Sequence, residues 1–338
     1  MSPSRPRAAI VGLRGGVVSP EERELFQGLP PAGFILFARN CQEPGQVAAL
    51  TAELRRLFPE RRLPVLIDQE GGRVMRLRPP HWPALPPAAR IGAMADGGHA
   101  AEAANRLGHA IGEELRALGI DVDCAPCLDV RRPDTTTAIG DRAFAADAAT
   151  VGRLGRAMAD GLLAAGVLPV MKHLPGHGRA VVDSHELLPM VDAGLDELEA
   201  ADFAPFRQNA DLPLAMTAHV VFTAIDPDAP ATHSRKVIEG VIRGRIGFEG
   251  ILLSDDLGMK ALGGSFEDRA GRAIAAGCDI ALHCSGDLAE AEAVLDAAGV
   301  LPAATAARLA SALADAAAAE PPARGVALAR LNQLLEVA

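Results

Sequence analysis

The chain has 338 residues, 49% of them hydrophobic, and a net charge of −10, so it can bury a large core beneath an acidic surface. Because it has no block of about five or six like charges, it lacks the basic footprint of a protein that binds nucleic acid. The N-terminus, Met1 to Leu13, is too short for a secretory signal and no run approaches the ~18 apolar residues of a membrane span, so we expect a cytoplasmic protein that binds no membrane.

Eight short apolar runs, each of the length of a buried strand, alternate with longer stretches along the chain. Strands that alternate with helices form a parallel sheet with helical crossovers, and eight such units match a closed (β/α)8 TIM barrel of the α/β class. An open, doubly wound sheet is the alternative architecture. The predicted strands are Ala8–Leu13, Gly33–Phe37, Pro64–Ile67, Ile120–Ala125, Leu168–Met171, Pro213–Thr217, Gly250–Ser254 and Asp279–His283.

The stretches between the strands are amphipathic, and several open with the Ser, Pro or Asp that begins a helix. The predicted helices are Pro20–Leu29, Pro44–Phe58, His99–Leu118, Ala146–Ala165, Leu195–Asn209, Ser234–Ile246, Ser265–Ala276 and Leu288–Ala298. The tail, residues 301–338, is alanine-rich and helical in pattern, with a break at Pro321-Pro322. Since neither a linker nor a change of composition marks it off, we expect it to pack on the barrel, so that residues 1–338 form a single domain.

Cofactor and disulfide signatures are weak. Gly12-Leu-Arg-Gly15-Gly16 follows the first strand but lacks the Gly-x-Gly-x-x-Gly register, and no Walker-type Gly-Lys-Ser/Thr occurs. The five cysteines are odd in number and sparse, which indicates reduced thiols. Cys124 and Cys127 have the spacing of a redox or zinc half-site, but no second pair completes it. We therefore interpret both as structural residues at a strand end, and expect no cofactor and no metal.

Polar residues gather where the predicted strands end. In barrel enzymes the C-terminal strand ends and the loops after them build the active site. Here those positions hold Asp68, Asp123 with Asp129, Lys172 with His173, His219, and Asp255. Asp68, followed by a Gly-Gly turn and Arg76, can present an acceptor and guanidinium donors to a ligand rich in hydroxyl groups, although a structural Asp–Arg pair is the alternative. Arg142, on another long loop, can add a donor.

The loop after the fifth strand is the strongest candidate for a catalytic segment. It runs from Leu174 to Pro189, well beyond the about 2–6 residues of ordinary α/β connections, and loops of that length are typically functional or disordered. It contains Asp183-Ser184-His185, and Gly176 and Gly178 are candidate hinges. An imidazole oriented by a carboxylate titrates near neutral pH and can act first as acid and then as base, so we predict that His185, with Asp183, transfers a proton.

Two adjacent aspartates, Asp255 and Asp256, close the seventh strand. Strand alternation allows only one of them to face the barrel axis, and periodicity does not choose between them. A carboxylate that faces a proton donor is the pairing that glycoside cleavage needs, because one group protonates the leaving oxygen and the other stabilises or traps the oxocarbenium-like centre. The usual donor is a second carboxylic acid, so His185 would be a departure.

Five motifs together resemble the family 3 glycoside hydrolases, and most of all their single-domain bacterial β-N-acetylglucosaminidases. Over residues 8–285 they are Asp68-Gln-Glu-Gly-Gly-Arg, Ile139-Gly140-Asp141-Arg142, Lys172-His173-x-Pro-Gly-His-Gly with Asp183-Ser184-His185, Met216-Thr-Ala-His219, and Ser254-Asp255-Asp256-Leu257-x-Met259. The resemblance implies a retaining hydrolase with Asp255 as nucleophile, His185 as general acid/base and Asp183 as its partner. It implies a site for terminal β-linked N-acetylglucosamine formed by Asp68, Arg76, Arg142, Lys172, His173, Met216 and His219.

The implied substrate is a cytoplasmic muropeptide of peptidoglycan recycling, such as N-acetylglucosaminyl-1,6-anhydro-N-acetylmuramic acid, and we expect a monomer. The chain departs from the family pattern at Leu174, where Phe is commoner, and in residues 128–137, which leaves the aglycone side open.

Three alternatives remain. A metal-dependent hydrolase could use His173, His177, His185 and Asp255 as ligands, but the usual His-x-His pair after the first strand is missing. A substrate-assisted hexosaminidase needs two carboxylates near the bond, which strand alternation at Asp255 and Asp256 disfavours. A non-catalytic sugar binder would not need Asp183, His185 or Asp255.

Overall fold

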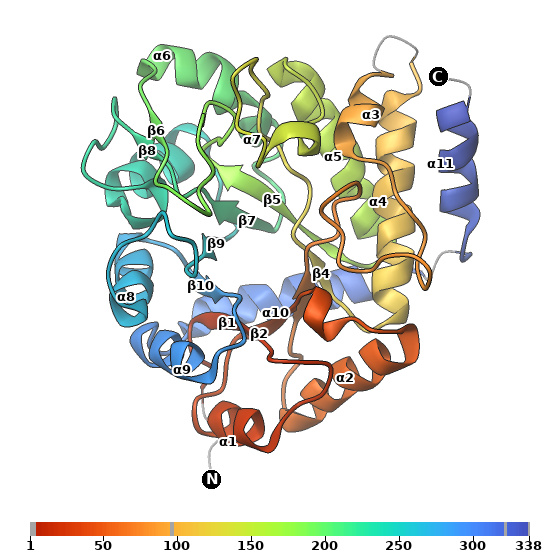
Figure 1. The fold of residues 1–338 in the computed structure, drawn as a ribbon, viewed down its shortest axis with the longest axis vertical. Helices are drawn as coiled ribbons and strands as arrows, with labels where there is room; N and C mark the ends of the chain where they lie inside the picture. Colours follow the sequence, from red (N-terminus) through yellow and green to blue (C-terminus); the bar gives the residue numbers. More distant parts are fainter. Residues whose placement is uncertain (1–4, 95–97, 321–322, 337–338) are drawn as a thin grey trace.

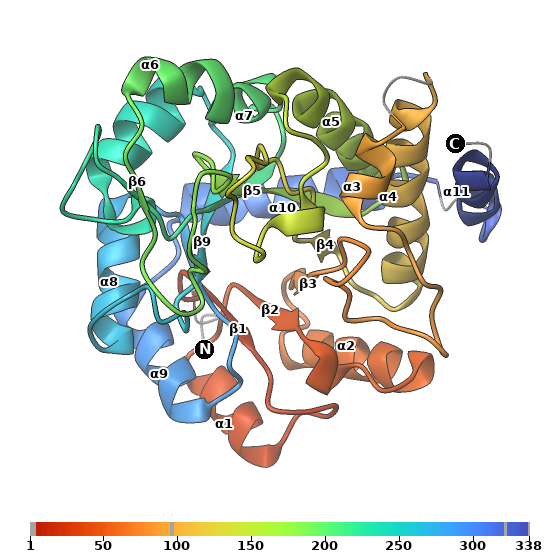
Figure 2. The same ribbon diagram turned by 45° about the horizontal axis from the view of Figure 1, so that its top comes forward.

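Eight parallel strands close into a barrel with helices around it (Figures 1 and 2). The structure, a computed structural model, describes residues 5–94, 98–320 and 323–336. Around the barrel the strands follow the order β1-β10-β9-β7-β5-β4-β3-β2, so that the first and last strands of the chain pair with each other. This closure confirms the predicted (β/α)8 TIM barrel and excludes the open, doubly wound sheet.

Each predicted strand overlaps one strand of the barrel. The bounds are β1 (Ala9–Gly12), β2 (Gly33–Leu36), β3 (Val65–Ile67), β4 (Val122–Asp123), β5 (Leu168–Leu174), β7 (Leu214–Thr217), β9 (Ile251–Asp256) and β10 (Ile280–His283). The differences lie at the strand ends, because β5 and β9 continue past their apolar runs into the polar residues that follow. A small parallel pair, β6 (Met190–Val191) with β8 (Val221–Phe222), was not predicted.

The helices on the outside of the barrel also fall where the sequence predicts them. They are α1 (Pro20–Gly28), α2 (Pro44–Leu57), α4 (Ala100–Ala117), α5 (Ala148–Ala164), η6 (Lys236–Arg245), α8 (Phe266–Ala276) and α9 (Leu288–Ala297). Four short helical segments were not predicted: α3 (Ala88–Gly92), η1 (Ala38–Asn40), η3 (Gly140–Arg142) and η5 (Ala231–His233). The predicted helix Leu195–Asn209 is broken into α6 (Leu195–Glu197), η4 (Leu198–Asp202) and α7 (Ala204–Gln208). Pro205 at the start of α7 has no N–H to continue the preceding helix.

Local chemistry explains the ends and the packing of these helices. Ser19 caps α1: its hydroxyl accepts from the Glu22 amide at 3.1 Å, while the Glu22 carboxylate accepts from the Ser19 amide at 2.8 Å. Helices α4 and α5 can lie close together because Gly108 has no side chain. A Cβ there would stand 2.0 Å from the Met158 carbonyl oxygen.

The C-terminal tail packs against the barrel. Helix α10 (Ala303–Ala317) lies across the end at which the strands begin, where Arg308 pairs with Asp279 at 3.1 Å (Figure 2). Helix α11 (Val326–Glu336) lies beside α4, and Arg330 pairs there with Glu102 at 2.8 Å (Figure 1). The predicted break at Pro321-Pro322 lies outside the described residues.

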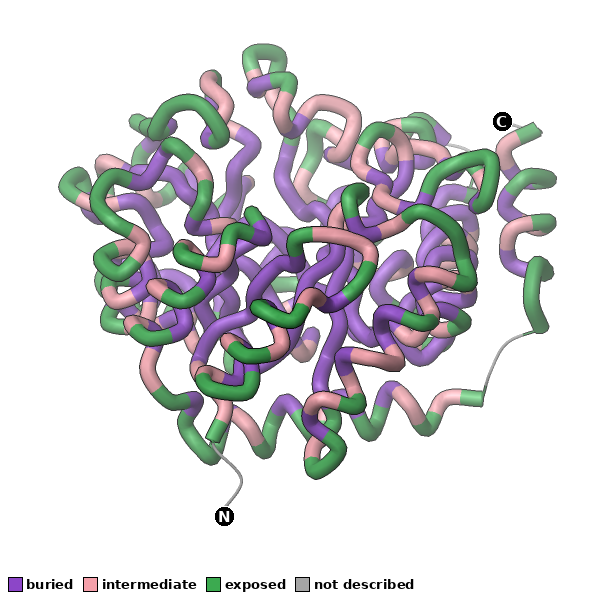
Figure 3. The backbone as a smooth tube through the Cα atoms, turned by 60° about the horizontal axis from the view of Figure 1, so that its bottom comes forward, coloured by how far each residue is buried: buried purple, intermediate pink, exposed green. Residues whose placement is uncertain are grey.

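The core of the molecule is the barrel interior together with the layer between strands and helices, where the buried backbone is concentrated (Figure 3). Strand side chains such as Ile10, Phe34 and Val170 are fully buried there. Among the described residues, no helix is both long enough and apolar enough to cross a membrane.

Candidate active site

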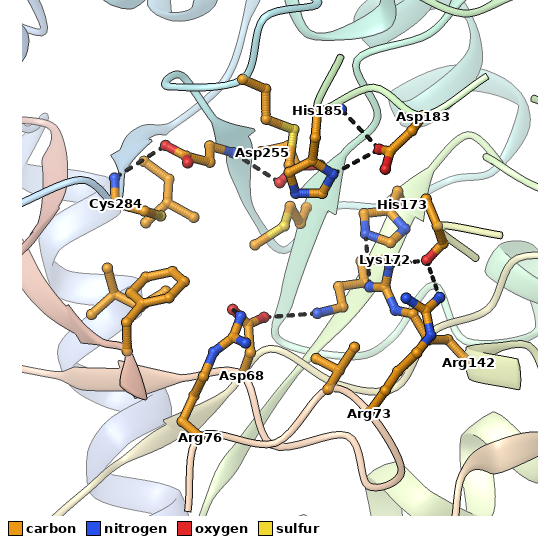
Figure 4. Close-up of a pocket in the computed structure, with 18 residues that line it drawn as sticks. Asp68, Arg73, Arg76, Arg142, Lys172, His173, Asp183, His185, Asp255 and Cys284 are labelled. Atoms are coloured by element: carbon orange, nitrogen blue, oxygen red, sulfur yellow. Dashed lines mark hydrogen bonds and ion pairs between the residues drawn. The ribbon is translucent and has the colours of Figure 1, made fainter. Parts of the chain in front are cut away.

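A cavity of about 330 Å³ opens at the end of the barrel where the strands finish (Figure 4). This is the position at which barrel enzymes place their active sites. Of the predicted site residues, the cavity brings together Asp68, Arg76, Arg142, Lys172, His173, Asp183, His185, Met216 and Asp255. His219 is the one that does not line it.

A chain of alternating charges forms one wall of the cavity. Lys172, almost fully buried, places its Nζ 2.9 Å from Asp68 Oδ1 and 2.6 Å from Glu70 Oε1. Arg76 Nη2 donates to Asp68 Oδ2 at 3.0 Å. Arg142 donates to both oxygens of Glu70, at 2.9 and 2.8 Å. Each carboxylate is thus shared by two cations, which holds all five side chains in place before a ligand arrives.

Their mutual attraction keeps these five side chains ionised. Burial alone would raise the pKa of Asp68 and Glu70, but Lys172 with Arg76, and Arg142 with Lys172, hold both well below their usual values. Burial likewise opposes the charge of Lys172, yet the two carboxylates raise the pKa of its ammonium group. At neutral pH the wall therefore offers fixed donors and acceptors to the hydroxyl groups of a sugar.

Glu70 and Gln69 are functional positions that the sequence reasoning did not single out, although both stand in a motif that it quoted. Glu70 is the shared acceptor of Lys172 and Arg142. The Gln69 side-chain oxygen accepts from the backbone amides of Arg76 and Leu77, at 2.8 and 3.1 Å. Gln69 thereby closes the loop on itself and sets the position of Arg76. A second acid two residues after a strand-end Asp was the available signal.

Two buried aspartates support this wall from behind. Asp123 accepts from the Gln69 amide at 2.9 Å, and burial raises its pKa well above the usual value. Asp129 Oδ2 lies 2.7 Å from His173 Nδ1. Burial would raise the pKa of Asp129, but His173 and His177 beside it lower it. With Nδ1 donating to this carboxylate, His173 turns Nε2 toward Arg142, 3.3 Å away.

Asp255 lies on β9 and is buried at the cavity wall. Its Oδ1 accepts from the Asp256 amide at 2.8 Å. Burial opposes its ionisation, but His173, His219, this amide and Lys172 together lower the pKa of the carboxyl. Asp255 is therefore an ionised carboxylate in a water-poor setting, which is the state that a nucleophile needs.

The expectation that only one of the two aspartates would reach the site was wrong, since Asp256 also lines the cavity. The pairing of β9 with β10 shifts register between Ile280 and Leu282, so regular alternation does not hold at this end of β9. Asp256 nevertheless differs in its contacts, because its Oδ1 accepts from the amides of Gly258 and Cys284 at 2.9 and 3.1 Å. It closes the loops after β9 and β10.

His219 lies behind the cavity wall. It is fully buried, with Nδ1 2.7 Å from the Thr232 hydroxyl and Nε2 2.9 Å from the Asp256 carbonyl oxygen. Both ring nitrogens are therefore occupied by the protein. The strand-end pattern placed His219 near the site, but its side chain acts on the position of Asp256 and on the charge of Asp255 rather than facing a ligand.

His185 and Asp183 face the cavity from the loop after β5, across from Asp68 and Arg76 (Figure 4). Asp183 Oδ1 accepts from the His185 amide at 2.9 Å and lies 2.8 Å from His185 Nδ1. Partial burial opposes ionisation of Asp183, but these two hydrogen bonds lower its pKa. The carboxylate thus holds the Nδ1–H tautomer and leaves Nε2 of His185 for proton exchange at the cavity.

The loop itself is more closely packed than a hinge would require. A Cβ on Gly178 would stand 2.0 Å from the Val130 carbonyl oxygen, so glycine is needed there for close approach. Gly176 has φ of 140°, in the region that favours glycine, beside Asp202. The two glycines therefore fix the start of the loop.

The proposed metal ligands His173, His177, His185 and Asp255 do not form a group in the part of the chain that the structure describes. A different group, Cys127, Asp129 and His173, has its ligand atoms within 4.8 Å of one another. Asp129 Oδ2 already accepts hydrogen bonds from the other two side chains, with Cys127 Sγ 3.2 Å and His173 Nδ1 2.7 Å away. All five cysteines are free thiols, and burial raises the pKa of Cys124 and Cys127.

Comparison with known proteins agrees with this geometry. The glycosyl hydrolase family 3 N-terminal domain matches residues 12–315. A beta-hexosaminidase of Alkalilimnicola ehrlichii is 43% identical over 82% of this chain and 80% of its own length.

Two solved structures are similar over 98% of the chain. NagZ from Neisseria gonorrhoeae, in complex with N-trifluoroacetyl-D-glucosamine, has a TM-score of 0.84 at 31% identity and is covered over 97% of its length. A family 3 beta-N-acetylglucosaminidase from Paenibacillus has a TM-score of 0.80 at 35% identity, and the chain spans 61% of that longer protein. The chain therefore belongs to glycosyl hydrolase family 3, among its NagZ-like beta-hexosaminidases.

Proposed function

We propose that this β-hexosaminidase is a retaining enzyme that releases terminal β-linked N-acetylglucosamine through a covalent intermediate on Asp255. The observation that carries the proposal is one cavity with an ionised, buried carboxylate and an imidazole backed by a carboxylate, both at its wall. In the first step the Asp255 carboxylate attacks the anomeric carbon, and the bond to the leaving oxygen breaks. In the second step water attacks the glycosyl ester and frees Asp255.

His185 is the proton carrier of both steps. Its Nε2–H gives a proton to the leaving oxygen, and the neutral ring then takes one from the attacking water. Asp183 keeps Nδ1 protonated throughout and stabilises the imidazolium, which is the form of the ring before the first proton transfer and after the second. The His185 side chain is 60% exposed, so it stands where an aglycone enters and leaves rather than behind the sugar.

The sugar itself is held by Asp68, Arg76, Arg142, Lys172 and His173, with Met216 as an apolar contact. The charged wall suits hydroxyl and acetamido groups because both its donors and its acceptors are fixed in advance. The amino sugar bound in the similar structure of NagZ supports this class of ligand. For the aglycone we propose the 1,6-anhydro-N-acetylmuramic acid of a muropeptide, hydrolysed by a cytoplasmic, single-domain monomer in peptidoglycan recycling.

The test compares substrates and follows stereochemistry. We expect aryl β-N-acetylglucosaminides to be cleaved far faster than aryl β-glucosides, and the anhydro-disaccharide to be cleaved as well. The first sugar released should keep the β configuration in an NMR time course, because two displacements restore it. Release of the α anomer would exclude the covalent mechanism, and a preference for glucosides would exclude the amino-sugar site.

A further inference from the structure

The catalytic loop is anchored by a residue that faces away from the substrate. Ser184 stands between Asp183 and His185, whose side chains are 39% and 60% exposed, yet Ser184 itself is 4% exposed. Its hydroxyl oxygen lies 3.2 Å from Nε2 of His177, another buried residue. The one buried side chain of the Asp-Ser-His segment is thus tied to the start of the same loop.

The direction of this hydrogen bond follows from the surroundings of the imidazole. Nδ1 of His177 has no partner among the described residues. An orphaned ring acceptor is less costly than an orphaned N–H, so the stable arrangement has Nε2–H donating to the Ser184 hydroxyl. That hydroxyl can then direct its own hydrogen to Met259 Sδ, 3.8 Å away. Burial and the neighbouring His173 lower the pKa of His177 to about 4, so the ring is neutral at neutral pH.

The same contact leads back to the sugar site. Asp129 Oδ1 accepts from the His177 amide at 2.7 Å, and its other oxygen lies 2.7 Å from His173. The rings of His173 and His177 also meet edge to face, with centroids 5.7 Å apart. One buried carboxylate therefore fixes both a residue of the sugar site and the residue that holds Ser184.

A second bond secures Ser184 on its far side. Its carbonyl oxygen accepts from the Ala261 amide at 3.2 Å, which joins the loop to the segment after β9. Since β9 carries Asp255, the Ser184 contacts span the distance between the two halves of the proposed catalytic pair. By contrast, a further link between these segments, the ion pair of Lys260 with Glu186 at 2.8 Å, is exposed on both sides and contributes little.

We propose that Ser184 and His177 form a latch that positions His185 and Asp183 over the cavity, so that breaking it lowers the fraction of molecules with the proton donor in place. Neither residue touches the substrate in this account; both are positioning residues. The inference rests on the proposed function, because it needs His185 to be the proton donor.

The test is a comparison of leaving groups in Ser184→Ala. For a disaccharide, which needs protonation, we expect kcat/KM to fall by about 10-fold, the effect of leaving one buried donor without its acceptor. For an aryl glycoside with an activated leaving group, kcat/KM should change by less than about 2-fold, since that bond breaks without acid assistance. Amide hydrogen exchange at Ala261 should also become faster. A purely structural loss would lower both substrates alike.

Matched variants separate the latch from general disturbance of the loop. His177→Gln keeps an N–H that can reach Ser184 and should retain most of the disaccharide activity, whereas His177→Leu should resemble Ser184→Ala. Combining Ser184→Ala with His177→Leu should cost no more than either change alone, because both remove one contact. Glu186→Gln, which breaks only the exposed pair, serves as the control and should leave both substrates unaffected.

His185→Ala, measured in parallel, separates the role of the latch from the role of His185 as proton donor. If it slows the disaccharide far more than the aryl substrate while Ser184→Ala slows both equally or neither, the latch is overturned and the proposed mechanism stands. If His185→Ala itself shows no dependence on the leaving group, the acid–base assignment is overturned, and the latch with it. If His177→Leu does not fold, the comparison in Ser184→Ala still decides.

Discussion

The two ends of the barrel hold similar side chains in different ways. At the end where strands begin, Asp121 accepts from Arg55 and Arg62 at 2.9 and 3.1 Å, and from the Val65 amide at 3.1 Å. At the end where strands finish, Asp68 is shared by Lys172 and Arg76 at 2.9 and 3.0 Å. Both are strand-associated aspartates bound to two cations.

The difference lies in what else the carboxylates hold. Asp121 binds the first amide of β3, and Asp279 binds the Leu252 amide near the start of β9 while pairing with Arg308 of α10. These acids fasten strands to each other and to the tail. Asp68 and its cations instead line a cavity, with their charges balanced by one another. An ion pair at the base of the barrel, where the strands begin, stabilises the fold. One at the mouth, where the strands finish, prepares a binding surface.

The largest loss of activity should come from replacing the proposed nucleophile, Asp255, at the mouth of the barrel. Asp255→Ala should lower kcat by more than about 10⁴-fold, because the covalent route is removed. Asp256→Ala should retain appreciable activity, because the contacts of Asp256 are with backbone amides of the Gly258 and Cys284 loops. Steady-state rates on an aryl N-acetylglucosaminide measure both.

The Asp255→Ala and Asp256→Ala variants also distinguish the covalent mechanism from the substrate-assisted one. This test is needed because both aspartates line the cavity. In a substrate-assisted enzyme the two carboxylates act together, so Asp256→Ala would be nearly as inactive as Asp255→Ala. A glycosyl adduct on Asp255, detected by mass spectrometry of the intact protein in His185→Ala, would support the covalent route.

A direct comparison of the two ends comes from Glu70→Gln and Asp121→Asn. Glu70→Gln removes the negative charge that Arg142 and Lys172 share, and should lower kcat/KM by about 10²-fold through misplaced sugar contacts. Asp121→Asn should lower the free energy of unfolding by about 1–3 kcal/mol while kcat/KM of the folded enzyme stays within a factor of about two. Urea unfolding and steady-state kinetics on both proteins provide the readout. Equal losses of kcat/KM would mean that the base of the barrel also sets the geometry of the site.

The fold could be predicted from the sequence because a parallel barrel repeats one simple pattern. Each apolar run sits on one strand, and the alternation with amphipathic helices identified the closed barrel. The errors cluster where apolar runs end: β5 continues through Lys172 and His173, and β9 through Asp256. Hydrophobic periodicity has no signal in strand segments made of polar residues, even when the backbone pairing continues.

The candidate site was predictable in membership but not in orientation. Parallel strands end on one face, so polar residues after several strands had to come together. Which way each side chain points depends on local register, and the shifts at the ends of β5 and β9 cannot be read from composition. Loop residues carry still less of this information: His219, after β7, was placed beside a ligand although it faces Thr232, and Glu70, after β3, was passed over although it holds two cations.

A smaller effect is the pH dependence of the free energy of unfolding, to which buried histidines and buried carboxylates contribute differently. His177 and His233 have pKa values lowered to about 4, chiefly by burial. A base with a lowered pKa gains protons in the unfolded state first, so its contribution is complete above pH ~6.5 and is lost as pH falls toward 4. The carboxylates Asp68 and Glu70, with lowered pKa values, stay ionised in both states between pH 7 and 5, whereas the buried carboxyl of Asp123, with its raised pKa, acts in the opposite direction to the histidines.

We therefore expect His233 to contribute a decrease of up to about 2 kcal/mol in the free energy of unfolding from pH 7 to pH 5. His233→Gln should shrink that decrease by a similar amount, since glutamine can still donate to the Arg269 carbonyl oxygen, which accepts from His233 Nε2 at 3.1 Å. Replacing the exposed His81 by Gln is the control. Urea unfolding at both pH values decides, and an unchanged pH dependence in His233→Gln would contradict the account.

The smallest expected effect is that of chelation. Among residues 5–94, 98–320 and 323–336, the group most suited to a cation is Cys127, Asp129 and His173, yet Cys127 and His173 already hydrogen-bond to the Asp129 carboxylate. Asp129 Oδ1 also accepts the amide of His177, so binding a metal there would break contacts that hold the sugar site and the catalytic loop. Prolonged dialysis against EDTA should therefore leave kcat and KM unchanged within error, and added zinc, if it enters, should inhibit rather than activate. Loss of turnover with EDTA and its recovery with zinc would mean that the mouth is a metal centre and that His185 does not act as a simple proton carrier.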